Sequence, residues 1–472
     1  MKKERAVPRI LLCAPASGSG KTLITCGILQ ALVNRGKKVA SFKCGPDYID
    51  PMFHGRVIGT KSRNLDTFFT DSNTTRYLFA ENTADCDLAV VEGVMGYFDG
   101  LGGVSTDGST YDVARTLSMP SVLIVNSRGA SLSVLATIKG FLSFREDSQI
   151  RAVILNQVSP MIYAQLKPLI EQELGVQVLG YVPKLTDLNL ESRHLGLVTP
   201  QEMENLQEKV RQAGEILTKT VDLELLEQIA GEAAVWKAEI SEESEKNGSL
   251  KSLNYPVRIA VARDEAFCFY YKDNLELLEN LGCEVIEFSP LHDKKLPENV
   301  KGILLGGGYP ELYGKELAEN QSMLESIRRA LDDKIPCLAE CGGFMYLHEE
   351  MEDTDGNVWK LVGRIHGRTF PTGKLARFGY VNLQVSSLGM GSEKETEGWF
   401  LPGENIRAHE FHYWDSTDSG SDCLAVKPDG KRSWECMHLE ENLVVGYPHL
   451  YYPSCEKFAE RFVEKCRSSY RE

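Results

Sequence analysis

The sequence predicts an α/β protein made of two doubly wound domains, and three observations support this fold class. The chain has 472 residues, enough for two or three domains that each bury a core. Short apolar runs alternate with segments of helical spacing, as in sheets that helices cover on both faces. This alternation begins a second time after a polar segment near residue 245. The composition, 42% hydrophobic and 25% charged, is that of an ordinary globular protein.

The first half of the chain contains apolar runs rich in Val, Ile and Leu, without polar alternation. Such runs are typical of strands buried on both faces of a parallel sheet. A helix is expected over 23–33, where Asn34-Arg35-Gly36 forms a C-terminal stop signal. The runs that we expect to be strands are 9–14, 39–42, 88–91, 121–125, 152–155 and 176–182.

The character of the sequence changes after about residue 200. Residues 201–228 have the pattern of a charged helix. Residues 240–252 are polar and include no aromatic residue, which is typical of a linker. A second α/β pattern starts at 255. We therefore expect a first domain over 1–235, a linker over 236–254 and a second domain over 255–472. The later strands are expected at 257–261, 284–288, 302–305 and 336–338.

The net charge excludes some classes of partner. With 52 basic and 67 acidic residues the formal charge is −15, which argues against nucleic acid or an anionic membrane as the main partner. The 12 cysteines include no C-x-x-C pair, which indicates reduced thiols. No run approaches the roughly 18 apolar residues of a membrane span, and the run at 10–12 is too short for a signal peptide. We expect a soluble, cytoplasmic protein.

A phosphate-binding loop is predicted directly after the first apolar run. Pro15-Ala-Ser-Gly-Ser-Gly-Lys-Thr22 follows a strand and opens a helix, so its amides converge on phosphate oxygens. Lys21 would reach the β and γ phosphates, and the Thr22 hydroxyl would coordinate Mg²⁺. Pro15 replaces the first glycine of the common pattern, as in variant loops of proteins that phosphorylate small carboxylates or partition cargo. The nucleotide-binding residues expected are Ser17, Gly18, Ser19, Gly20, Lys21 and Thr22.

Acidic residues at strand ends are candidates to complete a magnesium site with Thr22. Glu92 ends the apolar run 88–91, as in a Walker B element, and Asp99 follows it closely. Asp47 comes just after the second run. Ligands of open α/β sheets bind beyond the carboxyl ends of the strands, so Asp47, Glu92 and the loop are expected to converge there.

The second domain has the pattern of a cysteine nucleophile. Cys341 stands between an apolar strand and a helix, next to Gly342-Gly343, which predicts a strained elbow with the thiol over a helix N-terminus. The candidate oxyanion-hole amides are those of Gly307, Gly308 and Gly342. His449, at the end of an apolar strand, is the expected general base.

These residues resemble the class I glutamine amidotransferase family over about 255–472. That family usually has a carboxylate two residues after the histidine, but Tyr451 stands here, so we expect a Cys-His dyad, as in corrinoid amidases. The segment His409-Glu-Phe-His412 is not H-E-x-x-H. With its aromatic neighbours it predicts a packed or substrate-facing segment instead of a metal site.

Over nearly its full length the chain resembles the cobyrinic acid a,c-diamide synthase family, with a dethiobiotin-synthetase-like N-terminal domain. The resemblance depends on the phosphate loop, the elbow and the segments 43–51, 92–99, 191–196 and 409–412. It implies ATP- and Mg²⁺-dependent amidation of the a and c carboxylates of cobyrinic acid through acyl phosphates, with L-glutamine as the donor. Arg193 and His194 fall in a motif of that family, and we expect them to contact nucleotide or substrate. Tyr48 is expected to face the substrate because it adjoins Asp47.

Alternatives stay open at this point. The same chemistry could act on hydrogenobyrinic acid or on nickel-sirohydrochlorin. A different class of function is a partitioning-type P-loop ATPase with a passive C-terminal binding domain, and glutaminase activity would distinguish the two. Whether the chain forms a homodimer is also left open.

Overall fold

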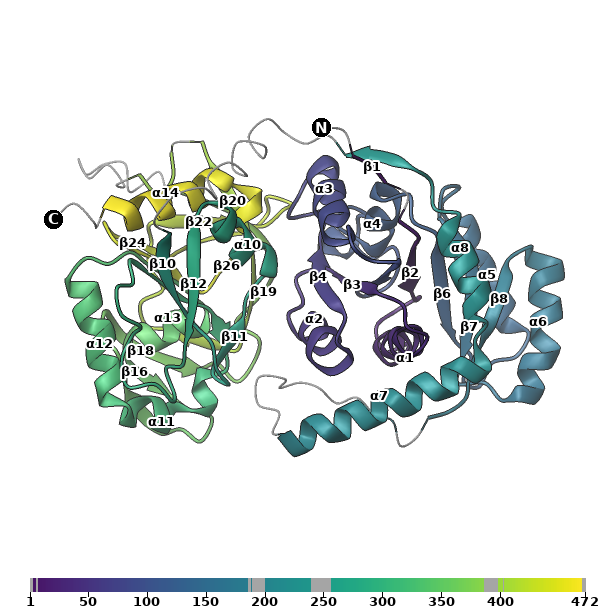
Figure 1. Ribbon diagram of the computed structural model, residues 1–472, viewed down its shortest axis with the longest axis horizontal. Helices are drawn as coiled ribbons and strands as arrows, with labels where there is room; N and C mark the ends of the chain where they lie inside the picture. Colours follow the sequence, from purple (N-terminus) through teal and green to yellow (C-terminus); the bar gives the residue numbers. More distant parts are fainter. Residues whose placement is uncertain are drawn as a thin grey trace. The chain divides into compact units, whose positions relative to one another are not determined.

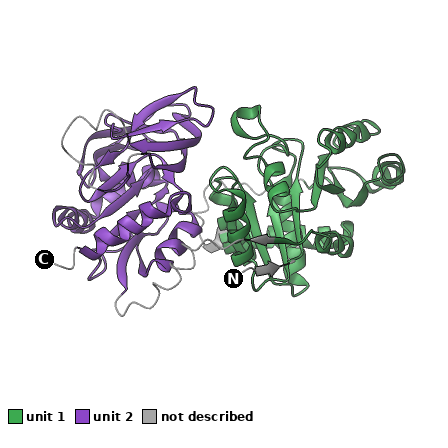
Figure 2. Ribbon diagram, turned by 90° about the horizontal axis from the view of Figure 1, so that it is seen from above, with its two compact units in different colours: residues 1–240 green, residues 241–472 purple. Residues whose placement is uncertain are grey.

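The structure is a computed structural model that describes residues 3–5, 7–185, 188, 200–238, 256–385, 398–401 and 403–468. The side chains of 3–5, 200–202 and 237–238 are not described. The chain divides into two compact units, residues 1–240 and 241–472, which Figure 2 draws in green and purple. Both units are α/β with a largely parallel central sheet, which confirms the predicted fold class.

The first unit is built on a seven-stranded, all-parallel sheet. All six predicted strands are present. The seventh, β4, was missed because its sequence K-S-R-N-L is polar, and it tolerates this at the sheet edge, where it pairs only with β3. In spatial order the strands are β4 (Lys61–Leu65), β3 (Val39–Cys44), β5 (Leu88–Glu92), β2 (Arg9–Cys13), β6 (Ser121–Asn126), β7 (Ile150–Asn156) and β8 (Gln177–Val182).

Helices cover both faces of this sheet, because successive residues of each strand point to opposite sides. In β2, Ile10 and Leu12 belong to one apolar cluster, while Leu11 and Cys13 belong to another. The first cluster packs under α1 (Lys21–Asn34), α7 (Pro200–Thr220) and α8 (Leu223–Gly231). The second packs under α3 (Ser72–Asn82), α4 (Thr110–Thr116), α5 (Ser133–Ser143) and α6 (Pro160–Leu174), as Figure 1 shows.

The end of this unit differs from the sequence prediction. Trp236–Ala238, assigned to the linker, forms β9 and pairs with β1 (Lys3–Arg5). The Trp236 indole donates to the Leu117 carbonyl (2.9 Å), and the Arg9 guanidinium lies 5.3 Å from the centre of its ring. The single charged helix expected over 201–228 is two helices, because Asp222 caps the start of α8.

The second unit has a six-stranded sheet in the order β12 (Cys283–Phe288), β10 (Val257–Ala262), β13 (Gly302–Leu305), β15 (Cys337–Glu340), β25 (Leu443–Gly446) and β24 (His438–Leu439). Only the short β24 is antiparallel. One face packs against α11 (Gly314–Glu319), α12 (Gln321–Asp332) and α13 (Gly342–Leu347). The other packs against α10 (Lys272–Asn280) and α14 (Glu456–Ser468).

An antiparallel sheet that the sequence did not predict packs beside α10 and α14. Its strands are β23 (Ser433–Cys436), β22 (Cys423–Val426), β19 (Arg377–Val385), β20 (Asn405–His412) and β26 (His449–Leu450). Val381, Leu383, Ile406 and Ala408 share one buried cluster with Val261 and Leu304 of the central sheet. This sheet places His449 at its edge strand. Within the described parts of the chain, none of the helices is long and apolar enough to cross a membrane.

Candidate functional site

The predicted phosphate loop joins β2 to α1 in the first unit. Gly18 and Gly20 have φ values of +75° and +90°, a left-handed conformation that favours glycine. A side chain on Gly20 would also lie 2.5 Å from Asn156 Nδ2, which donates to the Ser19 carbonyl (2.8 Å). The loop therefore requires glycine at position 20 both for its conformation and for its contact with β7.

Two buried lysines lie at this loop, Lys21 at the start of α1 and Lys43 in β3. Lys21 Nζ donates to the carbonyls of Met95 (2.6 Å) and Ala16 (3.3 Å). Lys43, at the carboxyl end of β3, lies 2.9 Å from Glu92 Oε1 and 2.5 Å from Asp50 Oδ2. Lys21 thus contacts only neutral backbone oxygens here, whereas Lys43 is paired with two carboxylates.

Glu92 is the centre of this buried group. Its side chain is fully buried and accepts a hydrogen bond from Thr22 Oγ1 (2.8 Å). His54 Nε2 lies 3.2 Å from its second oxygen. Thr22, Lys43 and His54, from three separate elements, therefore meet at one carboxylate beyond the end of β5, as expected of an open α/β sheet.

The charges of the group are coupled through the low dielectric of the interior. Burial alone would raise the pKa of Glu92, but Lys43 and His54 outweigh it and hold that pKa well below its ordinary value. Burial, and then the Glu92 charge, raise the pKa of Asp50 to about 6. The pKa of Lys21 is lowered by burial and by the charge of Lys43. Lys43 is thus the cation that keeps Glu92 ionised.

A cavity of about 630 Å³ opens beside these residues, within the size range of small-molecule sites. Lys21, Lys43 and Arg128 give it cationic side chains, and Thr22 and Asp47 also line it. Hydroxyl and carboxylate oxygens are hard donors of the kind that Mg²⁺ prefers. No group of three His, Cys, Asp or Glu side chains suited to a metal occurs in the described residues.

In the second unit, Cys341 stands at the turn between β15 and α13. Its φ of 49° and ψ of −105° make it a strained elbow, which the sequence predicted from the flanking glycines. A side chain on Gly343 would lie 2.1 Å from the Leu305 carbonyl, and one on Gly342 would lie 3.1 Å from the Gly308 amide nitrogen. Only glycines allow the elbow to lie this close to the end of β13.

His449, on the edge strand β26 of the antiparallel sheet, lies close to Gly307 beside this elbow. The Cys341 amide donates to the Gly446 carbonyl (2.8 Å), three residues before His449. A side chain on Gly307 would lie 2.4 Å from His449 Cε1. The segment Gly307–Gly308 therefore touches both the imidazole and the elbow.

Burial favours the neutral forms of both Cys341 and His449. Burial raises the pKa of the Cys341 thiol well above its ordinary value, although the Gly342 amide partly opposes this. Burial, with a contribution from His412, lowers the pKa of His449 to about 3. In this structure the thiol and the imidazole are therefore both neutral near pH 7, and the thiol would need a base to become nucleophilic.

Comparison with known proteins agrees with this pair of sites. The CobQ/CobB/MinD/ParA nucleotide binding domain matches residues 10–198, and the CobB/CobQ-like glutamine amidotransferase domain matches residues 258–455. Relatives named cobyrinate a,c-diamide synthase are similar along almost the whole chain. The Caldanaerobacter subterraneus protein is 36% identical over 461 residues (97% of this chain, 98% of the relative). The Clostridium tetani protein is 39% identical over 464 residues (97% and 99%). The chain belongs to the cobyrinate a,c-diamide synthase family.

Membership in the cobyrinate a,c-diamide synthase family establishes the class of reaction. The chain is a ligase that forms amides with glutamine as the nitrogen donor, and its first unit is a nucleotide-binding domain that uses ATP. The similarity extends over both units. A third relative of this name, from Priestia megaterium, is 36% identical over 468 residues, which is 98% of each chain.

The structure does not bring all predicted site residues of this synthase-family chain together. Asp47 lines the cavity and accepts from the amides of Ile49 (2.7 Å) and Asp50 (3.2 Å). Asp99 instead accepts from the Gly96 amide (2.9 Å) and shapes the turn that carries Met95. Tyr48 is half-buried at the start of α2 (Ile49–Phe53) and does not line the cavity. Arg193 and His194 lie outside the described residues.

Sequence reasoning missed four residues of the buried groups. Lys43 and Asp50 are the first and eighth residues of a segment, 43–50, in which only Asp47 and Tyr48 were singled out. His54 lies in the short π-helix after α2 and gives no local signal. Glu340 could have been found, because it ends an apolar strand as Glu92 does.

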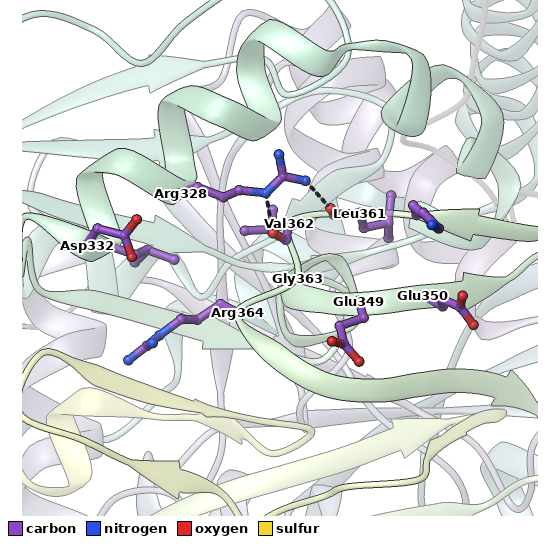
Figure 3. A pocket seen from close by; sticks show the side chains of 10 residues that line it. Arg328, Asp332, Glu349, Glu350, Leu361, Val362, Gly363 and Arg364 are labelled. Atoms are coloured by element: carbon purple, nitrogen blue, oxygen red, sulfur yellow. Dashed lines mark hydrogen bonds between the residues drawn. The ribbon is translucent and has the colours of Figure 1, made fainter.

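A hollow of about 580 Å³ in the second unit contains none of the predicted residues (Figure 3). Its Arg328 donates to the carbonyls of Val362 (2.6 Å) and Leu361 (2.7 Å), and its Arg364 is paired with Glu440. The guanidinium groups that line it are thus already engaged by the protein, and we assign it no role in the reaction.

Proposed function

We propose that the chain amidates the a and c acetate side chains of cobyrinic acid in two successive ATP-dependent steps of cobalamin biosynthesis. The observation that carries the proposal is the near full-length similarity to relatives of that name. A phosphate loop with a cationic cavity in one unit and a cysteine elbow in the other support it.

The first unit activates the carboxylate. A carboxylate oxygen of the substrate attacks the γ phosphorus of ATP, the bond to the β-phosphate oxygen breaks, and ADP leaves. Lys21, Lys43 and the loop amides balance the charge that builds on the phosphate oxygens. Mg²⁺ neutralises phosphate charge when bound, and Thr22, Asp47 and Glu92 are the residues proposed to hold or orient it; Asp99 would act through the Gly96 turn.

The second unit supplies ammonia. His449 takes the Cys341 proton, the sulfur attacks the amide carbon of glutamine, and the amides of Gly307, Gly308 and Gly342 receive the oxyanion. The C–N bond breaks, ammonia leaves with the proton from the imidazolium, and water hydrolyses the thioester to glutamate. Ammonia then attacks the acyl phosphate, phosphate leaves, and loss of a proton gives the carboxamide.

The substrate is tested directly by mass spectrometry. Cobyrinic acid incubated with the chain, ATP, Mg²⁺ and glutamine should show two successive carboxyl-to-amide mass changes. Parallel incubations with hydrogenobyrinic acid and nickel-sirohydrochlorin distinguish the remaining alternatives. Turnover of one of these and not of cobyrinic acid would replace the proposed substrate while keeping the chemistry.

The division of labour is tested with Cys341→Ala. This variant should lose glutamine-dependent amidation and keep ammonia-dependent amidation, because only the ammonia source is removed. Equal loss of both activities would contradict the proposal. A folded wild-type chain without glutaminase activity, even with ATP and substrate present, would favour the ATPase with a passive C-terminal unit.

A further inference from the structure

The residue two positions after His449 does not orient the imidazole. Tyr451 is buried, and its hydroxyl donates to Asp273 Oδ2 (2.8 Å) on α10. Its ring packs edge-on against Tyr271, with ring centres 5.4 Å apart. The position that carries the carboxylate in triad-type enzymes is thus directed into the packing of α10.

A different carboxylate faces His449. Glu340, the last residue of β15, has Oε2 at 3.9 Å from His449 Nδ1. Its other oxygen accepts from the Tyr452 hydroxyl (3.3 Å), and the Leu450 amide also donates to the carboxyl group. The side chains of Glu340 and His449 are 9% and 3% exposed, so little water competes for either group.

We propose that Glu340 is the positioning residue of His449. In triad-type enzymes the orienting carboxylate stands two residues after the histidine, whereas here it would come from β15, the strand that precedes the nucleophile. This inference depends on the proposed roles of Cys341 and His449 in glutamine hydrolysis. The distance of 3.9 Å is longer than a hydrogen bond, and catalytic hydrogen bonds of this kind are often long until substrate binds.

The function of such a carboxylate follows from the two ring nitrogens. An acceptor at Nδ1 holds the proton there, which leaves Nε2 unprotonated to take the Cys341 proton. Once the imidazolium forms, a carboxylate beside it stabilises the positive charge. Because the residue acts through the histidine, its loss should slow thiol activation without affecting the synthetase unit.

Other titratable groups also face this pair. Tyr452 contacts Glu340, His409 is the cross-strand neighbour of His449 on β20, and the charge of His412 also acts on His449. Burial raises the pKa of Glu340 to about 8, although the Leu450 amide and Tyr452 oppose this. The carboxyl group is therefore mostly protonated at pH 7 and ionised above about pH 8, so the positioning effect on glutamine hydrolysis should appear as the pH rises through about 8.

The first test compares Glu340→Gln and Glu340→Asp in the full-length chain. Gln keeps the shape of the side chain but not its charge, and the glutamine-dependent kcat should fall on the order of 10²–10⁴-fold. Asp should restore part of this loss, and ammonia-dependent amidation should be unchanged in both variants. The matched control is Tyr451→Phe, whose glutamine-dependent kcat should stay within about twofold of wild type.

The second test separates positioning from a structural effect. Alkylation of Cys341 by iodoacetamide, followed by peptide mass spectrometry as a function of pH, reports where the thiolate forms. In Glu340→Gln the alkylation profile should move to higher pH, since the imidazolium loses its counter-charge. A lower kcat with an unmoved profile would assign Glu340 a structural role and overturn the inference, as would an unchanged kcat. If Cys341→Ala still hydrolyses glutamine, the proposed function itself fails.

Discussion

Lys43→Met should destabilise the first unit strongly, because the ammonium lies 2.5 Å from Asp50 and 2.9 Å from Glu92 in a buried site. Met has a similar length but no charge, so the substitution removes the cation that is in direct contact with both buried carboxylates. Removing one partner of a buried ion pair costs about 3–5 kcal/mol. We expect a loss of this size in the free energy of unfolding at pH 8.

The loss should be smaller at pH 5. The pKa of Asp50 is about 6 in the folded chain, above its ordinary value of 3.8, so the folded state binds this proton more tightly. The protonation of Asp50 therefore contributes most to the free energy of unfolding below about pH 4. This contribution declines by about 3 kcal/mol as the pH rises through 6. Without Lys43 this pKa rises further, and a protonated Asp50 relieves part of the penalty at pH 5.

Hydrogen–deuterium exchange of peptides from β3 and β5, corrected for the pH dependence of intrinsic exchange, measures this free energy locally. Asp50→Asn is the control. In this variant Lys43→Met should lower the free energy of unfolding by less than it does in the wild type, and the difference should be about 0.5–3 kcal/mol. Equal losses at pH 5 and pH 8, or no loss at pH 8, would refute the assignment of Lys43 as the counter-charge of the two carboxylates.

Two further substitutions separate function from stability. Lys21→Ala should abolish ATP-dependent amidation but change the free energy of unfolding by less than about 1 kcal/mol, because Lys21 contacts only carbonyls and is repelled by Lys43. Equilibrium unfolding and turnover assays measure the two effects. Normal turnover would contradict the phosphate-loop assignment. Gly307→Ala places a methyl group 2.4 Å from His449 Cε1 and should displace the imidazole. Because a general base is then misplaced, the ratio of the glutamine-dependent rate to the ammonia-dependent rate should drop by roughly tenfold or more. An unchanged ratio would mean that the imidazole does not act in the position that it occupies here.

Six of the seven strands of the first sheet were predictable because burial of both faces demands continuous apolar runs such as 88–91. The antiparallel sheet of the second unit was not, because β19 and β20 alternate buried and exposed residues only irregularly. β22 and β23, of four residues each, are too short for a periodic signal.

The sequence by itself determined the features that depend on neighbours along the chain. The phosphate loop and the cysteine elbow are each a strand, a glycine-rich turn and a helix start, so both could be read locally. Full-length similarity then supplied the reaction class.

Only the tertiary structure decided which charged groups share a site. Lys43, Asp50 and His54 meet Glu92 because parallel pairing of β3 with β5 brings their carboxyl ends together. Glu340 faces His449 because β15 pairs with β25 and the chain then turns into β26. The contacts of Glu92 with His54 and Lys43 span 38 and 49 positions, and that of Glu340 with His449 spans 109. Such contacts depend on strand pairing, and their strength depends on the dielectric of the interior. Neither strand pairing nor the interior dielectric can be inferred from a short segment of the sequence.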